Sequence, residues 1–116
     1  AASDVYKRQG IDRALDVLDD GNKRLGLTPQ LQQHAIQLEL RRGRTDLAIV
    51  RMQTLEPMLG SSPDWKVDMA ELQLRAGNKD AAESLLQAAD QQLDTLRKTP
   101  ARVAHRERIG TLAQQI

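Results

Sequence analysis

The sequence predicts an all-α fold in which antiparallel helix pairs stack as a solenoid, and three observations support this expectation. A stretch of chain recurs at a fixed offset of 34, so that Leu38, Gly43 and Asp46 return with the same identity at 72, 77 and 80. Apolar residues recur at helical spacings, and aromatic residues make up only 2% of the chain, which favours an aliphatic helical core. A fixed period between about 20 and 50 residues is typical of repeat proteins, whose units bury a core by stacking.

The first nine residues are not expected to belong to the fold. They contain no initiator methionine and resemble a translated adaptor tract at the end of an assembled read. The repeat would place a glycine at 43 − 34 = 9, but Gln9 stands there with Gly10 beside it. We therefore interpret residues 1–9 as a non-native leader and residues 10–116 as one domain, a fragment of a longer bacterial protein. Without the leader the chain holds 17 − 2 = 15 basic and 16 − 1 = 15 acidic residues, so its net charge indicates no polyanion partner.

One set of helices carries the same apolar stripe three times. We expect these helices at about residues 11–25, 45–59 and 79–97, with a small residue where helix backbones approach closely. An aspartate in each first turn, at 12, 46 and 80, suits the positive end of the helix dipole. Pro57 is expected to end or bend the second helix near Glu56. The stripe positions are Ala14, Leu18, Gly21 and Leu25, then Ala48, Met52, Leu55 and Leu59, and finally Ala82, Leu86, Ala89 and Leu93.

A second set of helices alternates with the first, at about residues 29–42, 63–76 and 100–115. Each follows a hydroxyl residue and a proline, at 28–29, 62–63 and 99–100, which suit an N-cap and the first helical position. The first two helices end Leu-Arg-x-Gly, where Gly43 and Gly77 can adopt the left-handed cap conformation. The repeat would place the third proline at 63 + 34 = 97, but it stands at 100. The preceding helix, at about residues 79–97, is therefore expected to be longer than its counterparts. The chain thus holds about two and a half repeats plus a C-terminal helix.

This helix–turn–helix unit resembles the tetratricopeptide repeat (TPR) over roughly residues 11–93. The resemblance implies a TPR-like superhelix of antiparallel helix pairs. The chain also departs from the family, because Glu39 and Gln73 stand where an aromatic is favoured and Ile36 replaces a small residue. The residues that carry the resemblance are the glycines between paired helices, the small residues and the prolines between units, namely Gly43, Gly77, Ala48, Ala82, Ala70, Pro29 and Pro63.

The first helices of TPR units line a concave surface that grips a peptide or another protein. The resemblance therefore implies a protein–protein or protein–peptide interaction module or scaffold without catalysis. The alternative is an ordinary solvated helix face in a structural spacer within a larger protein. The Lys and Asn clamp that holds a C-terminal carboxylate in some members is absent here. The candidate concave-face residues are Gln33, Gln37, Arg41, Asp64, Val67, Glu71 and Arg75.

The sequence contains no pattern of residues that would support catalysis or bind a cofactor. Cysteine is absent, and so are a Walker loop, a nucleophile elbow and a dinucleotide fingerprint, so we expect no enzyme and no cofactor. His34 and His105 do not have the spacing of a metal site, and no metal is expected. Asp64, Asp68 and Glu71 share a helix face, which is either a weak cation site or, as we interpret it, a charged surface.

Trp65 is interpreted as a core residue because its stripe position matches that of Leu31. The alternative is an exposed anchor for a partner. No apolar run approaches the roughly 18 residues that span a membrane. The identity of the partner cannot be read from the sequence, and the compartment stays open between cytoplasm and periplasm.

A basic segment at residues 97–108 leaves weak nucleic-acid binding as a further alternative. Basic side chains neutralise phosphates whatever the fold that presents them. No aromatic residues interleave with them to stack on bases, which argues against this alternative. The basic residues of the segment are Arg97, Lys98, Arg102, Arg106 and Arg108.

Overall fold

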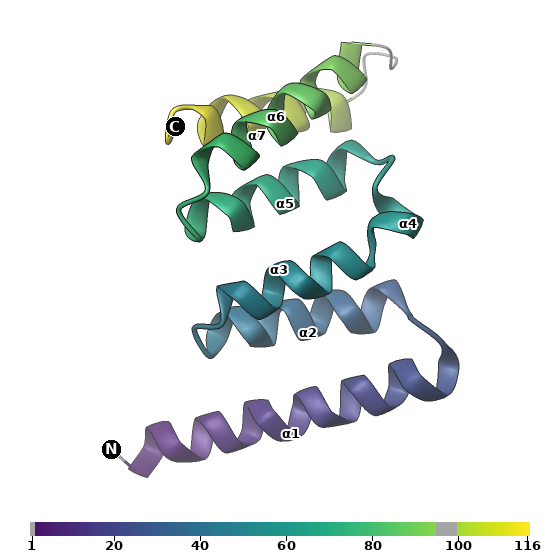
Figure 1. Cartoon of the computed structure of the whole chain (residues 1–116), viewed down its shortest axis with the longest axis vertical. Coiled ribbons are helices and arrows are strands. Elements are labelled where there is room, and N and C mark those ends of the chain that lie inside the picture. The colour runs from purple at the N-terminus through teal and green to yellow at the C-terminus, as the bar shows by residue number, and fades with distance from the viewer. Residues whose placement is uncertain (1, 95–99) are drawn as a thin grey trace. The chain divides into compact units, whose positions relative to one another are not determined.

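The computed structural model contains seven helices and no strand in the residues that it describes, 2–94 and 100–116 (Figure 1). Side chains are described for residues 8–94 and 102–116. The chain divides into two compact units, unit 1 with residues 1–55 and unit 2 with residues 56–116. The predicted all-α class is confirmed. The helices are α1 (Ala2–Leu25), α2 (Pro29–Arg41), α3 (Thr45–Thr54), α4 (Glu56–Leu59), α5 (Pro63–Arg75), α6 (Lys79–Asp94) and α7 (Pro100–Ala113).

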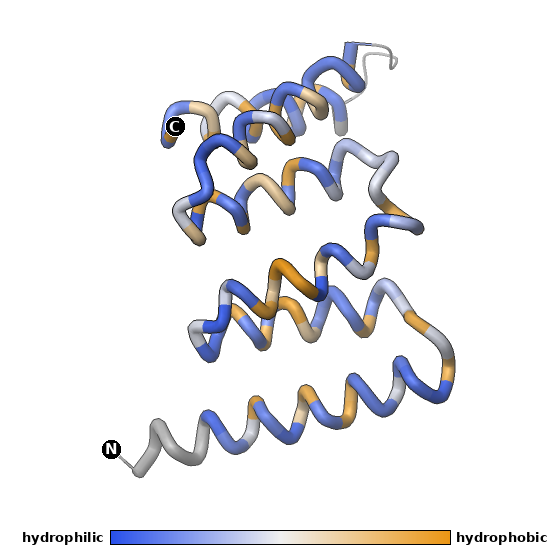
Figure 2. The backbone as a smooth tube through the Cα atoms, in the orientation of Figure 1, coloured by the Kyte–Doolittle hydropathy of each residue, from blue (hydrophilic) through white to orange (hydrophobic). Residues whose placement is uncertain are grey.

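Unit 1 consists of α1, α2 and α3, and each of the later two runs antiparallel to the helix before it (Figure 1). Leu15 of α1 packs with Ala35 and Leu38 of α2, and Ile11 and Leu18 are half-buried against this cluster. Apolar and polar residues alternate along α1 at helical spacing (Figure 2), so this helix is amphipathic and turns its apolar face to α2.

Unit 2 contains the short α4, the antiparallel pair α5 and α6, and α7, which packs against both members of the pair. Its core is aliphatic, as the composition predicts. Ala82 and Ala89 are fully buried where α6 packs on its neighbours, and such small side chains let two backbones approach. The core residues are Val67, Ala70, Ala82, Leu86, Ala89, Leu93, Ile109 and Leu112.

The pairs α2–α3 and α5–α6 repeat each other at the offset of 34. Adding 34 to the limits of α2 (29 and 41) gives those of α5 (63 and 75), and adding it to the first residue of α3 (45) gives that of α6 (79). Burial repeats as well, since Leu38, Ala48 and Met52 are buried and so are their counterparts at 72, 82 and 86. Helix limits and inward faces therefore follow the period that the sequence shows.

The turn inside each pair also repeats, bond by bond. Gly43 has a φ of 77° and its N–H donates to the Leu40 carbonyl, while Arg44 N–H donates to the Glu39 carbonyl. Gly77, with a φ of 85°, and the residue after it make the same two bonds. These paired bonds define the Schellman motif, so the predicted left-handed glycine caps are confirmed.

Several helix limits differ from expectation. α3 ends at Thr54 and α4 begins at Glu56, so the predicted break at Pro57 is confirmed and lies at Leu55. A proline ring clashes with the carbonyl four residues earlier, which ends a helix. α1 begins at Ala2 rather than at 11, so the prediction that Asp12 lies in a first turn is wrong. The expected end of the fifth helix at 97 lies outside the described residues, and α7 ends at Ala113 rather than at 115.

Of the three predicted hydroxyl caps, one is confirmed, one is wrong, and Thr99 lies outside the described residues. Ser62 accepts a hydrogen bond from the Asp64 N–H at 3.2 Å, as an N-cap should. Thr28 has the extended backbone of an N-cap, but its hydroxyl donates to the Gly26 carbonyl at 3.1 Å and caps nothing. Asn22 of α1 instead accepts from the Thr28 N–H at 3.0 Å, which ties the α1–α2 connection to α1.

Candidate partner-binding surface

Three of the predicted concave-face residues form one exposed stripe on α2, which we call the α2 face: Gln33, Gln37 and Arg41. They follow one another at intervals of four, so their side chains lie on the same side of the helix. All three are exposed, and none forms a hydrogen bond or ion pair with another residue in the part of the chain that the structure describes. The α2 face therefore keeps its amide and guanidinium groups available for an external partner.

The corresponding stripe on α5 is contacted by α7, which changes the interpretation of three residues. Val67 has an exposed fraction of 0% and belongs to the core with Ile109, so its prediction as a surface residue is wrong. Asp64 stays exposed but bonds to the His105 ring, and Glu71 accepts from Arg108 Nη2 at 2.5 Å. The cause is the packing of α7 along α5. The sequence did not predict where α7 packs.

Arg75 is the predicted α5 residue that keeps an exposed side chain at the end of the stripe. Its guanidinium lies 3.5 Å from a Glu71 oxygen, a loose contact one turn away on the same helix. Such exposed pairs contribute little to stability, so Arg75 remains accessible to a partner.

The carboxylates considered as a weak cation site serve instead as partners for α7. Arg108 donates to Asp68 at 2.6 Å and to Glu71 at 2.5 Å from its two terminal nitrogens. Burial lowers the pKa of Arg108, but its hydrogen bonds to the two carboxylates outweigh burial and raise that pKa above its ordinary value. Within the described residues, no group of three or more His, Asp or Glu side chains is placed to hold a metal ion.

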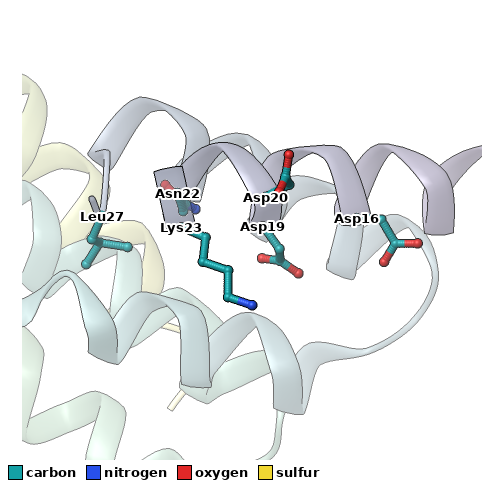
Figure 3. Close-up of a pocket in the computed structure, with 6 residues that line it drawn as sticks. All are labelled: Asp16, Asp19, Asp20, Asn22, Lys23 and Leu27. Carbon is teal, nitrogen blue, oxygen red and sulfur yellow. The ribbon is translucent and has the colours of Figure 1, made fainter. Parts of the chain in front are cut away.

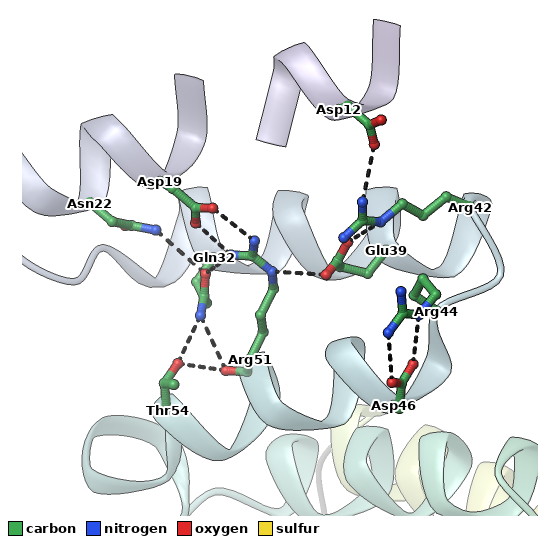
Figure 4. A network of polar contacts seen from close by, with 10 residues as sticks. All are labelled: Asp12, Asp19, Asn22, Gln32, Glu39, Arg42, Arg44, Asp46, Arg51 and Thr54. Carbon is green, nitrogen blue, oxygen red and sulfur yellow. Dashed lines mark hydrogen bonds and ion pairs between the residues drawn. The ribbon is translucent and has the colours of Figure 1, made fainter. Parts of the chain in front are cut away.

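The helix that carries the α2 face is held by an ion-pair network built around a buried carboxylate (Figure 4). Glu39 has an exposed fraction of 1%, and its carboxylate lies 2.5 Å from Arg42 Nε and 3.5 Å from Arg51 Nε. Arg51 of α3 donates twice to Asp19 of α1, at 2.7 and 3.0 Å, and Arg42 donates to Asp12 at 3.0 Å. The network joins α1, α2 and α3 through Glu39.

Gln32 completes the network at the other end of α2. Its amide nitrogen donates to Thr54 Oγ1 at 2.9 Å, and its amide oxygen accepts from Arg51 at 3.0 Å. Asn22 of α1 donates to the same oxygen at 3.4 Å. Because buried polar groups are costly unless they are paired, these bonds restrict α2 to one orientation between its neighbours.

The network around Glu39 shifts the pKa values of Asp19, Arg42 and Arg51. The hydrogen bond from Arg51 is the largest cause that holds the pKa of Asp19 below its ordinary value. The hydrogen bond with Glu39 is the largest cause that raises the pKa of Arg42, and that with Asp19 is the largest cause that raises the pKa of Arg51. All three shifts favour the charged forms, so these three groups are ionised at neutral pH.

A hollow of about 560 Å³ lies beside α1 and is lined by Asp16, Asp19, Asp20, Asn22, Lys23 and Leu27 (Figure 3). Two of its three carboxylates already have cationic partners, because Asp19 pairs with Arg51 and Asp20 with Arg24 at 3.0 Å. We therefore interpret the hollow as a charged surface of α1.

The remaining predicted residues divide between core and surface. Trp65 is buried, as its stripe position predicts. His34 is exposed, and His105 is half-buried beside Asp64. None of the described helices combines the length and the apolarity that crossing a bilayer requires.

The Glu39 network was not foreseen, although a comparison of the repeats contains its signal. Glu39 and Arg51 become Gln73 and Leu85 at the offset of 34, so both partners change together. A pair of charges that is present in one repeat and lost as a pair in the next indicates contact between the two positions. Comparison of the whole chain with protein-family models, curated proteins and solved structures finds no match.

Proposed function

We propose that this chain is a TPR-like helical-repeat module, stacked as a solenoid, that binds a protein or peptide segment and performs no catalysis. The observation that carries the proposal is the α2 face, a polar stripe without internal partners among the described residues, on a helix that the Glu39 network holds in place. A rigid helix that presents free polar groups binds at a low entropic cost, because little must be ordered on association.

The chemistry of the α2 face suits an extended segment that carries a carboxylate. The amides of Gln33 and Gln37 can each donate and accept, which matches the alternating groups of a peptide backbone. Arg41 can bind a carboxylate through two parallel hydrogen bonds. The recurrence of helix limits and Schellman turns at one offset supports the TPR-like part of the proposal.

A selection from a displayed library of random peptides tests this proposal. Peptides enriched on the parent protein should contain Asp or Glu and should bind the double variant Gln37→Ala, Arg41→Ala at least about tenfold more weakly, a loss of about 1.4 kcal/mol. The matched control is Arg44→Ala with Gln53→Ala, which removes the same groups from exposed positions just before α3 and on α3. Peptides that bind parent and both variants equally, or no enrichment at all, would favour the structural spacer.

A further inference from the structure

A groove of about 470 Å³ lies between α6 and α7 in unit 2. Leu86, Ile109 and Ala113 give it an apolar lining, and Glu83 adds a carboxylate. Gly110 also lines the groove, and a Cβ added to it would meet nothing within 4 Å. A glycine inside a helix costs about 1 kcal/mol relative to alanine. No neighbour among the described residues requires that glycine, so the position leaves room for a chain that approaches from outside.

The corresponding groove in unit 1 is filled by α3. α6 corresponds to α1 at an offset of 68, twice the repeat, and α7 corresponds to α2 at an offset of 71, which maps Pro29 onto Pro100. In unit 1, Asp19 of α1 and Glu39 of α2 both contact Arg51 of α3. The residues at the corresponding positions in unit 2 are 19 + 68 = 87, a glutamine, and 39 + 71 = 110, a glycine, and both line the groove.

We propose that this groove receives α1 of a second copy of the chain. α1 corresponds to α3 at the offset of 34, and Val17 stands at the position of Arg51. Val17 is 71% exposed within its own chain, which leaves an apolar side chain in water between the charged residues Arg13 and Asp20. In the docked position, Val17 meets Gly110 where Arg51 meets Glu39 in unit 1. The charged pair of Arg51 and Glu39 in unit 1 thus corresponds to an uncharged, close-packed pair of Val17 and Gly110 in the proposed interface.

The charges around the groove complement those of α1 in the same register. In unit 1, Arg51 of α3 contacts Asp19 of α1, and these two helices run parallel (Figure 4 shows the contact). One turn earlier on both helices, the same register sets Arg13 of the docked α1 opposite Glu83 of α6. Opposite charges at the edge of an interface select the register and speed association.

One contact in this register joins like charges. Asp20 of the docked helix lies opposite Asp90 of α6. Each of these carboxylates already has a cation on its own chain, since Arg24 lies 3.0 Å from Asp20 and Arg106 lies 3.6 Å from Asp90. These local pairs reduce the repulsion between the two carboxylates.

Docking of this kind is heterologous, because one surface of a copy binds a different surface of the next. A heterologous contact continues from copy to copy unless its rotation closes a ring. The proposal therefore predicts association whose average mass rises with protein concentration and passes the mass of a dimer. It is independent of the segment that the α2 face binds.

The test transplants the charged pair of unit 1 into the proposed interface and measures mass by sedimentation. Val17→Arg alone sets a cation against Gly110, and Gly110→Glu alone sets a carboxylate against Val17. Each should raise the concentration for half-association at least tenfold. An equimolar mixture of the two variants should associate past the mass of a dimer, as the parent does. Contacts between the intact Val17 of one variant and the intact Gly110 of the other then alternate with contacts between the introduced arginine and the introduced glutamate.

Val50→Arg is the matched control, since Val50 is a half-exposed valine on α3 outside the proposed interface. It should leave association unchanged, and circular dichroism should show that all three variants stay helical. A parent that remains monomeric at every concentration, or variants that associate like the parent, would overturn the proposal. A mixture that fails to restore association would overturn it as well, since a heterologous interface requires that rescue.

Discussion

At the scale of single residues, the two cap glycines are the positions where backbone conformation decides identity. Gly77 has a φ of 85°, and no atom beyond its chain neighbours lies within 4 Å of the place that a Cβ would occupy, so conformation and not space excludes larger residues there. The left-handed region costs other residues about 1–2 kcal/mol. The Leu-Arg-x-Gly pattern predicted this conformation because a left-handed glycine lets the chain satisfy the last carbonyls of a helix.

Gly77→Ala should lower the free energy of unfolding by about 1 kcal/mol, measured by urea denaturation. Gly110→Ala provides the matched control, since Gly110 also has free space around it but lies inside α7 without a left-handed φ. That substitution should stabilise the protein by about 1 kcal/mol. Equal effects of the two substitutions would show that Gly77 holds no special conformation.

Asp19 should make unit 1 sensitive to acid. Its pKa is lowered in the folded chain, so the ionised carboxylate stabilises the fold at every pH above the unfolded value of about 3.9. This stabilisation is lost as the pH falls through the folded pKa, because protonation removes the charge that Arg51 binds. Thermal unfolding of the parent across the acid range should show this loss, and Asp19→Asn should show a smaller one. An unchanged pH profile in Asp19→Asn would contradict the assignment.

At the scale of helices, the sequence predicted termini better than it predicted neighbours. Helix α5 begins at the proline and ends at the arginine before its cap, as local rules require. No local rule predicted the register of α7 against α5. In that register, Asp64 contacts His105 and Glu71 contacts Arg108, although both acidic residues were predicted to face a partner.

Glu39→Gln should destabilise unit 1 by about 1–3 kcal/mol, because it leaves Arg42 and Arg51 without their shared carboxylate. The effect should stay below the roughly 3–5 kcal/mol typical of a broken, fully buried pair. The reason is that the Arg51 side chain keeps an exposed fraction of 16% and its contact with Asp19. Chemical denaturation followed by circular dichroism measures the change.

The control for this substitution is Asp20→Asn, which breaks an exposed pair on α1 and should change stability little. A Glu39→Gln variant as stable as Asp20→Asn would show that the network around Glu39 is dispensable.

At the scale of the whole molecule, charge is nearly balanced, and ion pairs inside unit 2 engage part of the basic segment. The formal net charge is +1. Two cations of the basic segment are engaged inside unit 2, where Arg106 bonds to Asp94 and Arg108 to Asp68. Arg97 and Lys98 lie outside the described residues. Ion pairs with carboxylates would have to be broken before phosphates could bind these two arginines.

The protein should therefore leave the mobility of a DNA duplex unchanged in a gel at low ionic strength. Low salt is the stringent condition, because non-specific binding strengthens as salt falls. The double variant Asp68→Asn, Glu71→Gln is tested beside the parent as a companion variant, since it removes the carboxylates that accept hydrogen bonds from Arg108. Retardation by the companion alone would show that pairing masks the arginine, whereas retardation by the parent would restore nucleic-acid binding as a function.

By itself, the sequence determined the helical class, the limits of α2 and α5, the glycine caps and the inward stripes of α2, α3, α5 and α6. These features arise within about one helical turn or from a period that the chain repeats, so local rules suffice to find them. The stripe predicted for α1 is wrong at Leu25, which is 77% exposed, and it missed Leu15, which is buried against α2. Only the tertiary structure decided which polar residues remain free. Gln37 of α2 stays exposed while its counterpart Glu71 pairs with Arg108, which is 37 positions away. Side chains so distant in sequence meet only through packing, which no local pattern encodes.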